Sequence, residues 1–264
     1  MTNRTTFGVD LSSSNFYIRR MDTHGFSKAA KMPSASLPMV GFLYLTDGEL
    51  LVEACGQSYL CSAGHLLLIP EKEPFTIPHY FDAVGYTGCF ATSLVNDARR
   101  LSAMREPIQQ AFWFDEGIFM AELFNMLSLS FERNDMVFIR KGLDLLVSRI
   151  KPGTGARLPE RVSKFLDSIF DNKSTLSRPS EYAGQTNLSG NYLNRIVKEA
   201  TGRPVSDWLD IARVGRAKKL LEDPSIQIID VAEAVGIDDQ SYFARFFKRQ
   251  TGMTPSAFRK MMHG

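Results

Sequence analysis

One helical pattern occurs twice in the last third of this 264-residue chain, with a spacing of 50 positions. The two segments read NYLNRIVKEATG, residues 191–202, and SYFARFFKRQTG, residues 241–252. Identical residues stand at matched places: Tyr192/Tyr242, Arg195/Arg245, Lys198/Lys248, Thr201/Thr251 and Gly202/Gly252. In each copy the apolar residues lie at i, i+1, i+4 and i+5, which predicts a helix with one buried stripe. The two stripes are Tyr192, Leu193, Ile196 and Val197, and then Tyr242, Phe243, Phe246 and Phe247.

A second short helix is predicted before each copy. Residues 228–235 are apolar at helical spacing, Gly236 can end that helix with a positive φ, and the Asp239 carboxylate can cap the next one. Residues 181–186 take the same place before the first copy, where Ser189 is the expected cap. The chain therefore contains a helix, a turn and a second helix, twice.

Charge is distributed unevenly between the two halves of the sequence. Residues 156–264 contain 17 Lys and Arg and 13 Asp and Glu, a net charge of +4, whereas residues 1–155 carry a net charge of −2. A basic excess beside two helix-turn-helix patterns favours a nucleic-acid partner. The alternative for the same residues is a small helical bundle whose Lys and Arg only solvate its surface.

The C-terminal part resembles a known DNA-binding domain. The segment RVGRAKKLL, residues 213–221, followed by residues 228–260, resembles the C-terminal domain of the AraC/XylS family of bacterial transcription regulators. The resemblance covers residues 158–264 and includes both units, the RxxRAxxLL helix between them and the GxxPSxFR-like ending. It implies a transcription activator with double-stranded DNA and RNA polymerase as partners, although the sequence leaves activation and repression both open.

The resemblance also implies which residues contact DNA. A long helix over residues 204–221 would hold the two recognition helices so that they enter successive major grooves. The side chains expected to read bases are Asn191, Asn194, Arg195, Gln240, Ser241, Ala244 and Arg245. Those expected at phosphates, together with the helix N-termini, are Ser189, Lys198, Asp239, Lys248 and Arg249. Ala244 stands where the first copy has Asn194, so hydrogen-bond readout is lost there and a thymine methyl contact is possible.

Three further residues are assigned to the core of this domain. Arg213, in the joining helix, is expected to pair with an acidic neighbour rather than to touch DNA. Trp208 and Phe258 follow the two recognition helices at the same distance, and we expect them to be equivalent anchors of the core.

The whole chain is predicted to be an α+β protein of two domains, residues 1–150 and 158–264, with a linker at residues 151–157. Two prolines and two glycines interrupt the apolar pattern in KPGTGARLP, residues 151–159. Neither a signal peptide nor an apolar run of the ~18 residues needed to span a bilayer is present, so a cytoplasmic protein with no membrane contact is expected.

Residues 15–90 read as short strands separated by turns, with Asp47-Gly48 as the strongest hairpin signal. The run from Phe42 to Pro70 resembles the cupin-type barrel that many AraC relatives carry, here expected over residues 6–92. This resemblance implies control by a small molecule in the barrel, with no effector-binding residue identified. Control by a protein partner is the alternative reading.

A cupin-like enzyme fused to the DNA-binding domain is the third reading. The cupin metal motif needs two histidines one residue apart, whereas His65 is isolated and His79 lies fourteen positions later. Hydrogen-bonded structural roles are expected for both. We therefore expect no catalytic residue, metal or cofactor, and no enzymatic activity.

Residues 93–150 are predicted to be helical. Apolar stripes over residues 115–131 and 136–150, broken at residues 132–135, predict a helical hairpin. The hairpin could cover the barrel or form a homodimer interface through residues 116–150, and the aromatic run Phe112, Trp113 and Phe114 fits either role.

The three cysteines, Cys55, Cys61 and Cys89, show no zinc-site spacing. Buried free thiols in strands are expected, with a redox pair of Cys55 and Cys61 as the alternative.

Overall fold

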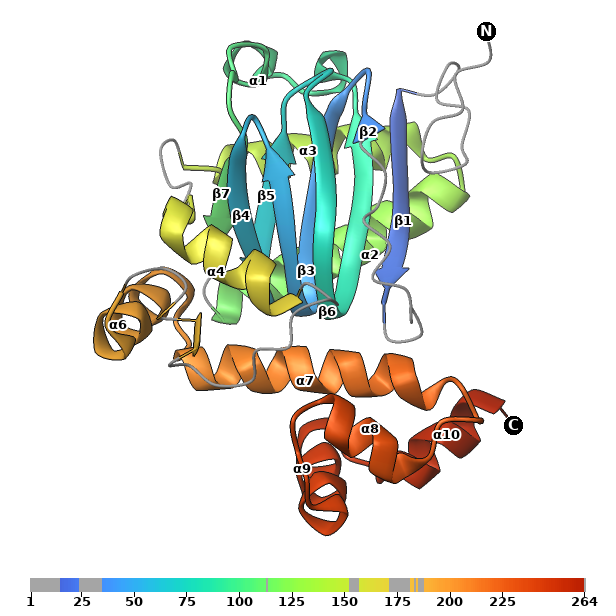
Figure 1. Ribbon diagram of the computed structural model, residues 1–264. Coiled ribbons are helices and arrows are strands. Elements are labelled where there is room, and N and C mark those ends of the chain that lie inside the picture. The colour runs from blue at the N-terminus through green and yellow to red at the C-terminus, as the bar shows by residue number, and fades with distance from the viewer. Residues whose placement is uncertain are drawn as a thin grey trace, which may run out of the picture. The chain divides into compact units, whose positions relative to one another are not determined.

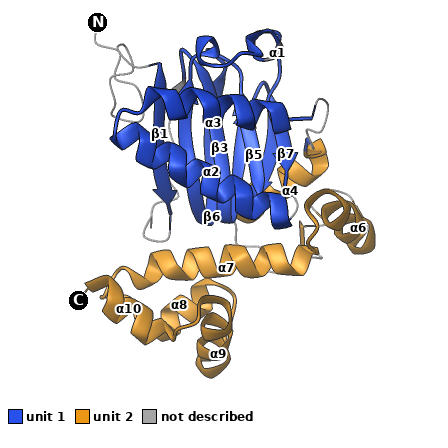
Figure 2. Cartoon of the chain, turned by 180° about the vertical axis from the view of Figure 1, so that it is seen from behind, with its two compact units in different colours: residues 1–157 blue, residues 158–264 orange. Residues whose placement is uncertain are grey.

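The structure, a computed structural model, describes residues 15–23, 35–112, 114–151, 157–170, 181–182, 184 and 188–263. The chain forms two compact units that divide between Arg157 and Leu158 (Figure 2). The first contains a β-sheet with helices, and the described residues of the second form helices and connecting turns. The mixed α and β character of the fold prediction is therefore confirmed.

The N-terminal unit is built on one antiparallel sheet. Its strands are β1 (Phe16–Asp22), β2 (Ala35–Ser36), β3 (Val40–Ala54), β4 (Gln57–Ser62), β5 (His65–Ile69), β6 (Pro74–Phe90) and β7 (Ile108–Ala111). The order is β1-β6-β3-β5-β7, with β2 also paired to β6 and β4 to β3 (Figure 1). The long strands β3 and β6 pair along most of their length and connect the two sides of the sheet. Among the described strands this pairing path is open, so a closed barrel remains a prediction.

Asp47 and Gly48 do not form the predicted hairpin turn. Strand β3 continues through them, and its register against β6 shifts between Leu45 and Asp47 and again between Asp47 and Glu49. Gly48 has a φ of +70°, and a Cβ there would lie 2.3 Å from the Asp82 carbonyl oxygen. The dipeptide therefore forms a β-bulge instead of a turn. The paired strand β6 is irregular at the facing residue Asp82, whose φ is +43°.

Short strands separated by turns, as expected from the sequence, are found at two places. Cys55 and Gly56 join β3 to β4 with positive φ values of 51° and 66°, and Ala63 and Gly64 join β4 to β5. The sequence did not predict β2, the first half of β6, or β7, which lies inside the stretch expected to be helical.

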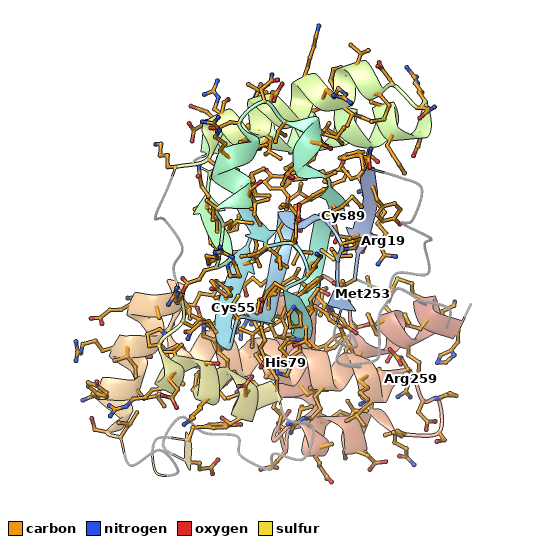
Figure 3. All side chains as sticks on the ribbon, turned by 90° about the horizontal axis from the view of Figure 1, so that it is seen from above. Arg19, Cys55, His79, Cys89, Met253 and Arg259 are labelled. Atoms are coloured by element: carbon orange, nitrogen blue, oxygen red, sulfur yellow. The ribbon has the colours of Figure 1, made fainter. Side chains whose placement is uncertain are left out.

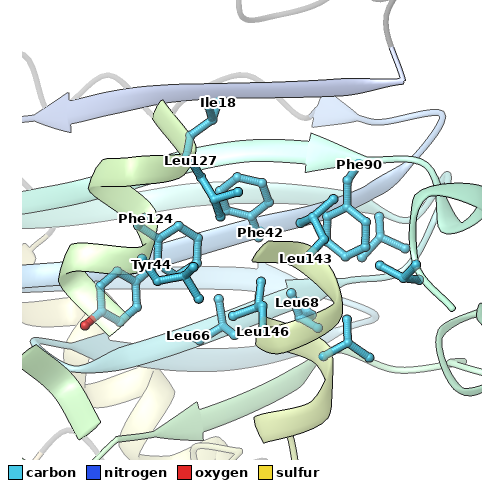
Figure 4. Packing of buried hydrophobic residues seen from close by; sticks show 14 of the residues in the cluster. Ile18, Phe42, Tyr44, Leu66, Leu68, Phe90, Phe124, Leu127, Leu143 and Leu146 are labelled. Atoms are coloured by element: carbon cyan, nitrogen blue, oxygen red, sulfur yellow. The ribbon is translucent and has the colours of Figure 1, made fainter. Parts of the chain in front are cut away.

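Both faces of the sheet are buried. Side chains alternate along β3, so that Phe42 and Tyr44 join one apolar cluster while Leu43 and Leu45 join another. The first cluster is covered by α2 (Phe114–Glu132) and α3 (Met136–Arg149), as Figure 4 shows. This double burial explains why the strands are almost continuously apolar.

The predicted helical hairpin is confirmed. Helices α2 and α3 pack together, and the Asp135 carboxylate caps α3 by accepting from the Phe138 N–H at 3.0 Å. Two short helices, η1 (Thr92–Leu94) and α1 (Ala98–Ser102), precede β7. In the aromatic run, Phe112 is buried and Phe114 is 81% exposed, while Trp113 lies outside the described residues.

The hairpin is apolar on its outer side as well as its inner side. Leu123 and Leu146 face the sheet cluster and are 7% and 0% exposed. Other large apolar side chains of the hairpin stay in solvent: Phe114, Ile118, Phe119, Met126, Leu129, Val137 and Leu145. The inner stripe therefore covers the sheet, and a second apolar surface remains uncovered in the single chain.

The C-terminal unit contains α4 (Glu160–Phe170), α6 (Gly190–Thr201), α7 (Val205–Leu221), α8 (Ile228–Ala234), α9 (Gln240–Thr251) and α10 (Pro255–His263). Within this unit α6 lies at one end of α7, and α8, α9 and α10 gather at the other (Figure 1). The predicted helices 191–202, 228–235 and 241–252 are confirmed. Half of the helix predicted at 181–186 lies outside the described residues, whereas Glu181, Tyr182 and Gly184 are described and are helical.

Replacing Phe124 by Ala should destabilise the N-terminal unit by about 3 to 5 kcal/mol, because it removes a fully buried ring. This ring stacks on Tyr44 with centroids 4.6 Å apart. Chemical unfolding of the full chain measures the effect, with the neighbouring exposed Asn125→Ala as the matched control. A loss below about 1 kcal/mol for Phe124→Ala would contradict the described packing.

Candidate nucleic-acid interface

The helices α6 and α9 begin and end in the same way. The Ser189 hydroxyl accepts from the Tyr192 N–H at 3.2 Å, and the Asp239 carboxylate accepts from the Tyr242 N–H at 2.6 Å. Each helix ends at a glycine in the left-handed region, with φ of 76° and 80°. The predicted caps are therefore confirmed, and these local signals alone fix both helix boundaries.

The turns that follow the two helices are also alike. The Thr201 hydroxyl lies 2.8 Å from the Val197 carbonyl oxygen, and the Thr251 hydroxyl lies 2.8 Å from that of Phe247. Each hydroxyl also accepts from the backbone N–H two residues later, at 3.3 and 3.4 Å. The recurring threonine thus joins the last turn of each helix to the next segment.

The expected core anchors occupy equivalent places. Trp208 is fully buried, and its indole N–H donates to the Thr201 hydroxyl at 2.9 Å. Phe258 follows the second recognition helix and is also buried, and its ring meets the Phe247 ring edge-on, with centroids 5.6 Å apart. The prediction that Trp208 and Phe258 are matching anchors is confirmed.

One part of the predicted buried stripes is wrong. Leu193, Val197 and the three phenylalanines of α9 are buried, but Tyr242 is 49% exposed. Tyr242 stands at the edge of its stripe in the first turn of α9, where the phenol extends beyond the core. Ile229, predicted as apolar core of α8, is 40% exposed.

The polar faces of both helices point to solvent. On α6 the exposed residues include Asn191, Asn194, Arg195 and Lys198, and on α9 they include Gln240, Ser241, Arg245, Lys248 and Arg249. Ala244 is half-buried. Each set shares one helix; α6 lies beyond one end of α7, and α9 lies alongside α7 (Figure 1).

On α6, two of these side chains have partners within the protein. An Arg195 guanidinium nitrogen lies 3.4 Å from a Glu199 carboxylate oxygen, and the guanidinium carbon lies 5.1 Å from the centre of the Tyr192 ring. The Asn194 side-chain oxygen accepts from the Val205 N–H at 3.0 Å, which connects α6 to the first residue of α7.

The matching positions on α9 carry different chemistry. Arg249 stands where α6 has Glu199, one helical turn after Arg245, the arginine that matches Arg195. The Arg249 guanidinium carbon lies 5.8 Å from the centre of the Phe246 ring. Arg245 therefore has a cation as its neighbour at i+4, whereas Arg195 has an anion. Helix α9 contains no acidic residue, and Asp238 and Asp239 stand just before its first residue.

The capping role of Asp239 limits what it can offer a phosphate. Its carboxylate is committed to the Tyr242 N–H, and a carboxylate repels a phosphate group. A phosphate at this end of α9 would be held by backbone N–H groups of the first turn, whose partial charge is positive. Ser189 carries no such charge, and its hydroxyl can still donate.

The ends and middle of α7 are held by side chains. Arg213 pairs with Asp210 at 3.1 Å, which confirms the expected acidic partner. Arg259, on α10, donates to the carbonyl oxygens of Leu221 at 3.2 Å and Ile226 at 2.7 Å (Figure 3). Sequence reasoning did not assign this role to Arg259, although the residue ends the GxxPSxFR-like segment that it singled out.

The chemistry-bearing residues of the N-terminal unit are dispersed. Cys55, His79 and Cys89 lie at separate places on the sheet (Figure 3), and the described residues contain no group of three His, Cys, Asp or Glu side chains that could hold a metal ion. The His65 ring nitrogen Nδ1 lies 3.1 Å from the Gln109 amide nitrogen, and burial lowers the pKa of His65. His65 is thus part of a polar contact inside the fold, as expected.

The cysteines are free thiols in this structure. Cys61 and Cys89 are buried in strands, as predicted, and burial raises the pKa of each to about 12. Cys55 differs from the prediction, because it lies in the β3–β4 turn and is partly exposed. Burial of its sulfur, reinforced by the Glu73 carboxylate, raises the pKa of Cys55 from 9.0 to about 11.

The raised pKa of Cys55 predicts slow alkylation of the native protein. The thiolate is the reactive form, so a rise of this size lowers the rate at pH 8 about 100-fold relative to an unperturbed thiol. The rate should increase as the pH approaches 11. Mass spectrometry after timed iodoacetamide treatment measures it, with the unfolded chain as control. Equal rates in the native and unfolded chains would disprove this expectation.

No described helix has the length and apolarity that crossing a membrane would require.

Comparison with known proteins places one domain family on the C-terminal unit. The family described as "Helix-turn-helix domain" matches residues 182–261. The chain is 34% identical over 100 residues to the Msm operon regulatory protein of Streptococcus mutans, covering 38% of this chain and 35% of that protein. It is 29% identical over 117 residues to the arabinose operon regulatory protein of Escherichia coli, covering 44% of this chain and 39% of that protein. The chain thus spans well under half the length of these two relatives.

One solved structure is similar to part of the chain. The C-terminal domain of AraT, a response regulator from Geobacillus stearothermophilus, is 30% identical, with 39% of this chain and 87% of that domain covered and a TM-score of 0.36.

Proposed function

Because residues 182–261 form a helix-turn-helix domain of the AraC/XylS family, we propose that this chain is a sequence-specific DNA-binding regulator of transcription. The observation that carries the proposal is the repeated helix. Helices α6 and α9 share their caps, their following turn and their core anchor, and each exposes a polar face with an arginine and a lysine at matched positions. Such a face suits base edges and phosphates.

The length of α7 supports simultaneous reading by both helices. Its 17 residues span about 25 Å at 1.5 Å per residue, with α6 beyond one end and α9 alongside the helix (Figure 1). This is shorter than the ~34 Å that separates successive major grooves on one face of B-DNA, and in this proposal α6, which lies beyond the end of α7, supplies the remaining separation. In this proposal each recognition helix occupies one groove.

The roles of the side chains follow from their place on the two faces. Base reading is proposed for Asn191, Arg195, Gln240, Ser241 and Arg245. The sequence also assigned Asn194 and Ala244 to base reading, but the Asn194 side-chain oxygen is bonded to the Val205 N–H. Phosphate contacts are proposed for Ser189, Lys198, Lys248 and Arg249 and for the helix N-terminus capped by Asp239. Phosphate contacts position the protein, and base contacts determine the sequence that it prefers.

Substituting Arg195 or Arg245 by Ala should each cost about 1 to 3 kcal/mol at the preferred DNA site and relax the preference at different base positions. The reason is that each arginine reaches a different groove. Selection from a random DNA library, followed by titration of the selected site, measures both effects. An unchanged base preference in both variants would refute these assignments.

Lys248→Ala should weaken binding to all DNA sequences alike and reduce the slope of log affinity against log salt by about one unit. A phosphate contact carries no sequence information, so the base preference should stay the same. Lys219→Ala, an exposed change on α7, is the matched control and should leave the slope unchanged. A sequence-dependent loss in Lys248→Ala would instead assign that lysine to base reading.

For the N-terminal unit we propose a cupin-like sheet that binds a small molecule and thereby controls DNA binding. The support is its architecture, since the face of the sheet opposite α2 and α3 gathers its own apolar cluster. Control by a protein partner is the second candidate, favoured by the uncovered apolar surface of α2 and α3. Thermal shift of the purified chain with metabolite mixtures separates the two, because a ligand selective for the folded state raises the melting temperature.

The uncovered surface of α2 and α3 also supports a homodimer through residues 116–150. Ile118 and Leu129 are 52% and 39% exposed, so their replacement by Glu leaves the sheet cluster intact. We expect Ile118→Glu or Leu129→Glu to yield a folded monomer, because a charge opposes burial of this surface. Leu123→Glu is the contrasting control and should unfold the unit, since Leu123 packs inside.

Sedimentation velocity and circular dichroism together measure this outcome. A parent chain that sediments as a monomer at tens of micromolar, with and without DNA, would exclude the proposed dimer.

A further inference from the structure

The two helix-turn-helix repeats differ at three linked positions. Where the first repeat has Asn194, Pro204 and Val205, the second has Ala244, Thr254 and Pro255, each 50 residues later. All six residues stand where the recognition helix meets the start of the next helix. The differences concern one requirement, the backbone N–H groups at a helix start, which have no partner within their own helix.

In the first repeat a side chain from the recognition helix accepts from the first N–H of the next helix. Helix α7 begins at Val205, and the preceding Pro204 offers no side-chain cap. The Val205 N–H donates to the Asn194 side-chain oxygen at 3.0 Å, across 11 residues of sequence. The Val205 side chain is 2% exposed, so this end of α7 is embedded in the unit.

In the second repeat the first residue of the next helix has no N–H that needs an acceptor. Helix α10 begins at Pro255, which has no N–H to satisfy, and proline is favoured at the first position of a helix. The preceding Thr254 hydroxyl accepts from the Ala257 N–H at 3.2 Å. Ala244 has no polar side-chain atom, and none is needed opposite a proline.

We infer that Asn194 is a positioning residue, which fixes the recognition helix α6 against the first turn of α7, rather than a reader of bases. This rests on the proposed function and changes the role of one residue within it. Reading of adenine by asparagine uses the side-chain oxygen and nitrogen together, and here the oxygen is bonded to Val205. Base reading by α6 then belongs to Asn191 and Arg195, whose direction depends on how α6 is held.

The inference explains why the repeat tolerates Ala244. If Asn194 read a base, its replacement by Ala244 in the second copy would cost α9 one base contact. If Asn194 only accepts from the N–H at the start of α7, no such residue is needed in the second copy, because Pro255 has no N–H. The Thr201 to Trp208 hydrogen bond also joins α6 to α7 in the first copy. Two ties on different turns of α6 fix its rotation as well as its distance from α7.

Replacing Asn194 and Val205 by the residues that the second repeat has at the matched positions, Ala and Pro, tests the inference. Asn194→Ala alone should lower the melting temperature of the C-terminal unit by roughly 4 to 8 °C, because the Val205 N–H loses its acceptor. It should also lower affinity for the selected DNA site about tenfold. The double variant Asn194→Ala/Val205→Pro removes the donor too, and both properties should return towards the parent. The selected base preference should match the parent at every position.

Controls separate a positioning role from the alternatives. Ala244→Asn should leave the melting temperature unchanged, because Pro255 offers nothing to bond. Asn194→Asp keeps the acceptor and should retain the parent's melting temperature, which tests the cap even where Val205→Pro disturbs the buried packing.

Two results would overturn the inference. The first is an Asn194→Ala variant with the melting temperature of the parent. The second is a double variant that recovers its melting temperature but loses preference at one base position, which would make Asn194 a reader. A parent chain that binds no DNA sequence selectively would refute the proposed function instead, and the melting temperatures would still report on the cap.

Discussion

The C-terminal unit depends on how the two ends of one helix are satisfied. Helix α7 leaves N–H groups at its start and carbonyl groups at its end without partners inside the helix. Asn194 accepts from the Val205 N–H at the start, where the Trp208 indole also donates to the Thr201 hydroxyl, and Arg259 donates to the Leu221 carbonyl at the end. Each of these ties comes from the repeat at that end. The hydrogen bonds that complete α7 are therefore the same ones that orient α6 on one side and α8 to α10 on the other.

The N-terminal unit depends on a different constraint, the burial of both faces of one sheet. Strands β3 and β6 are long enough to take part in both apolar clusters, and they deviate together at Gly48 and Asp82. The bulge allows a continuous strand to change direction without losing its partner. Helices α2 and α3 cover one face through Phe124, Leu127 and their neighbours, and the other face packs its own side chains together.

The sequence was most informative where the signals were local. Ser189, Asp239 and the two terminal glycines fix the recognition helices by contacts within a few residues, so their boundaries followed from spacing alone. Asp47-Gly48 was read wrongly because the outcome depends on β6, more than thirty residues away. The stripes of α2 predicted a helix, yet they could not show that Leu123 faces inward and Ile118 outward, because this helix is apolar on both sides.

The opposite charges at matched positions of the two repeats have a consequence for direction. Glu199 stands beside Arg195 on α6, and Arg249 stands beside Phe246 on α9. A chain laid along DNA would therefore present two electrostatically unequal ends, whatever the bases beneath them. Turning the chain end for end would exchange an anion for a cation at each groove. The molecule is therefore electrostatically asymmetric along α7, and two identical halves of one site would meet unlike charges.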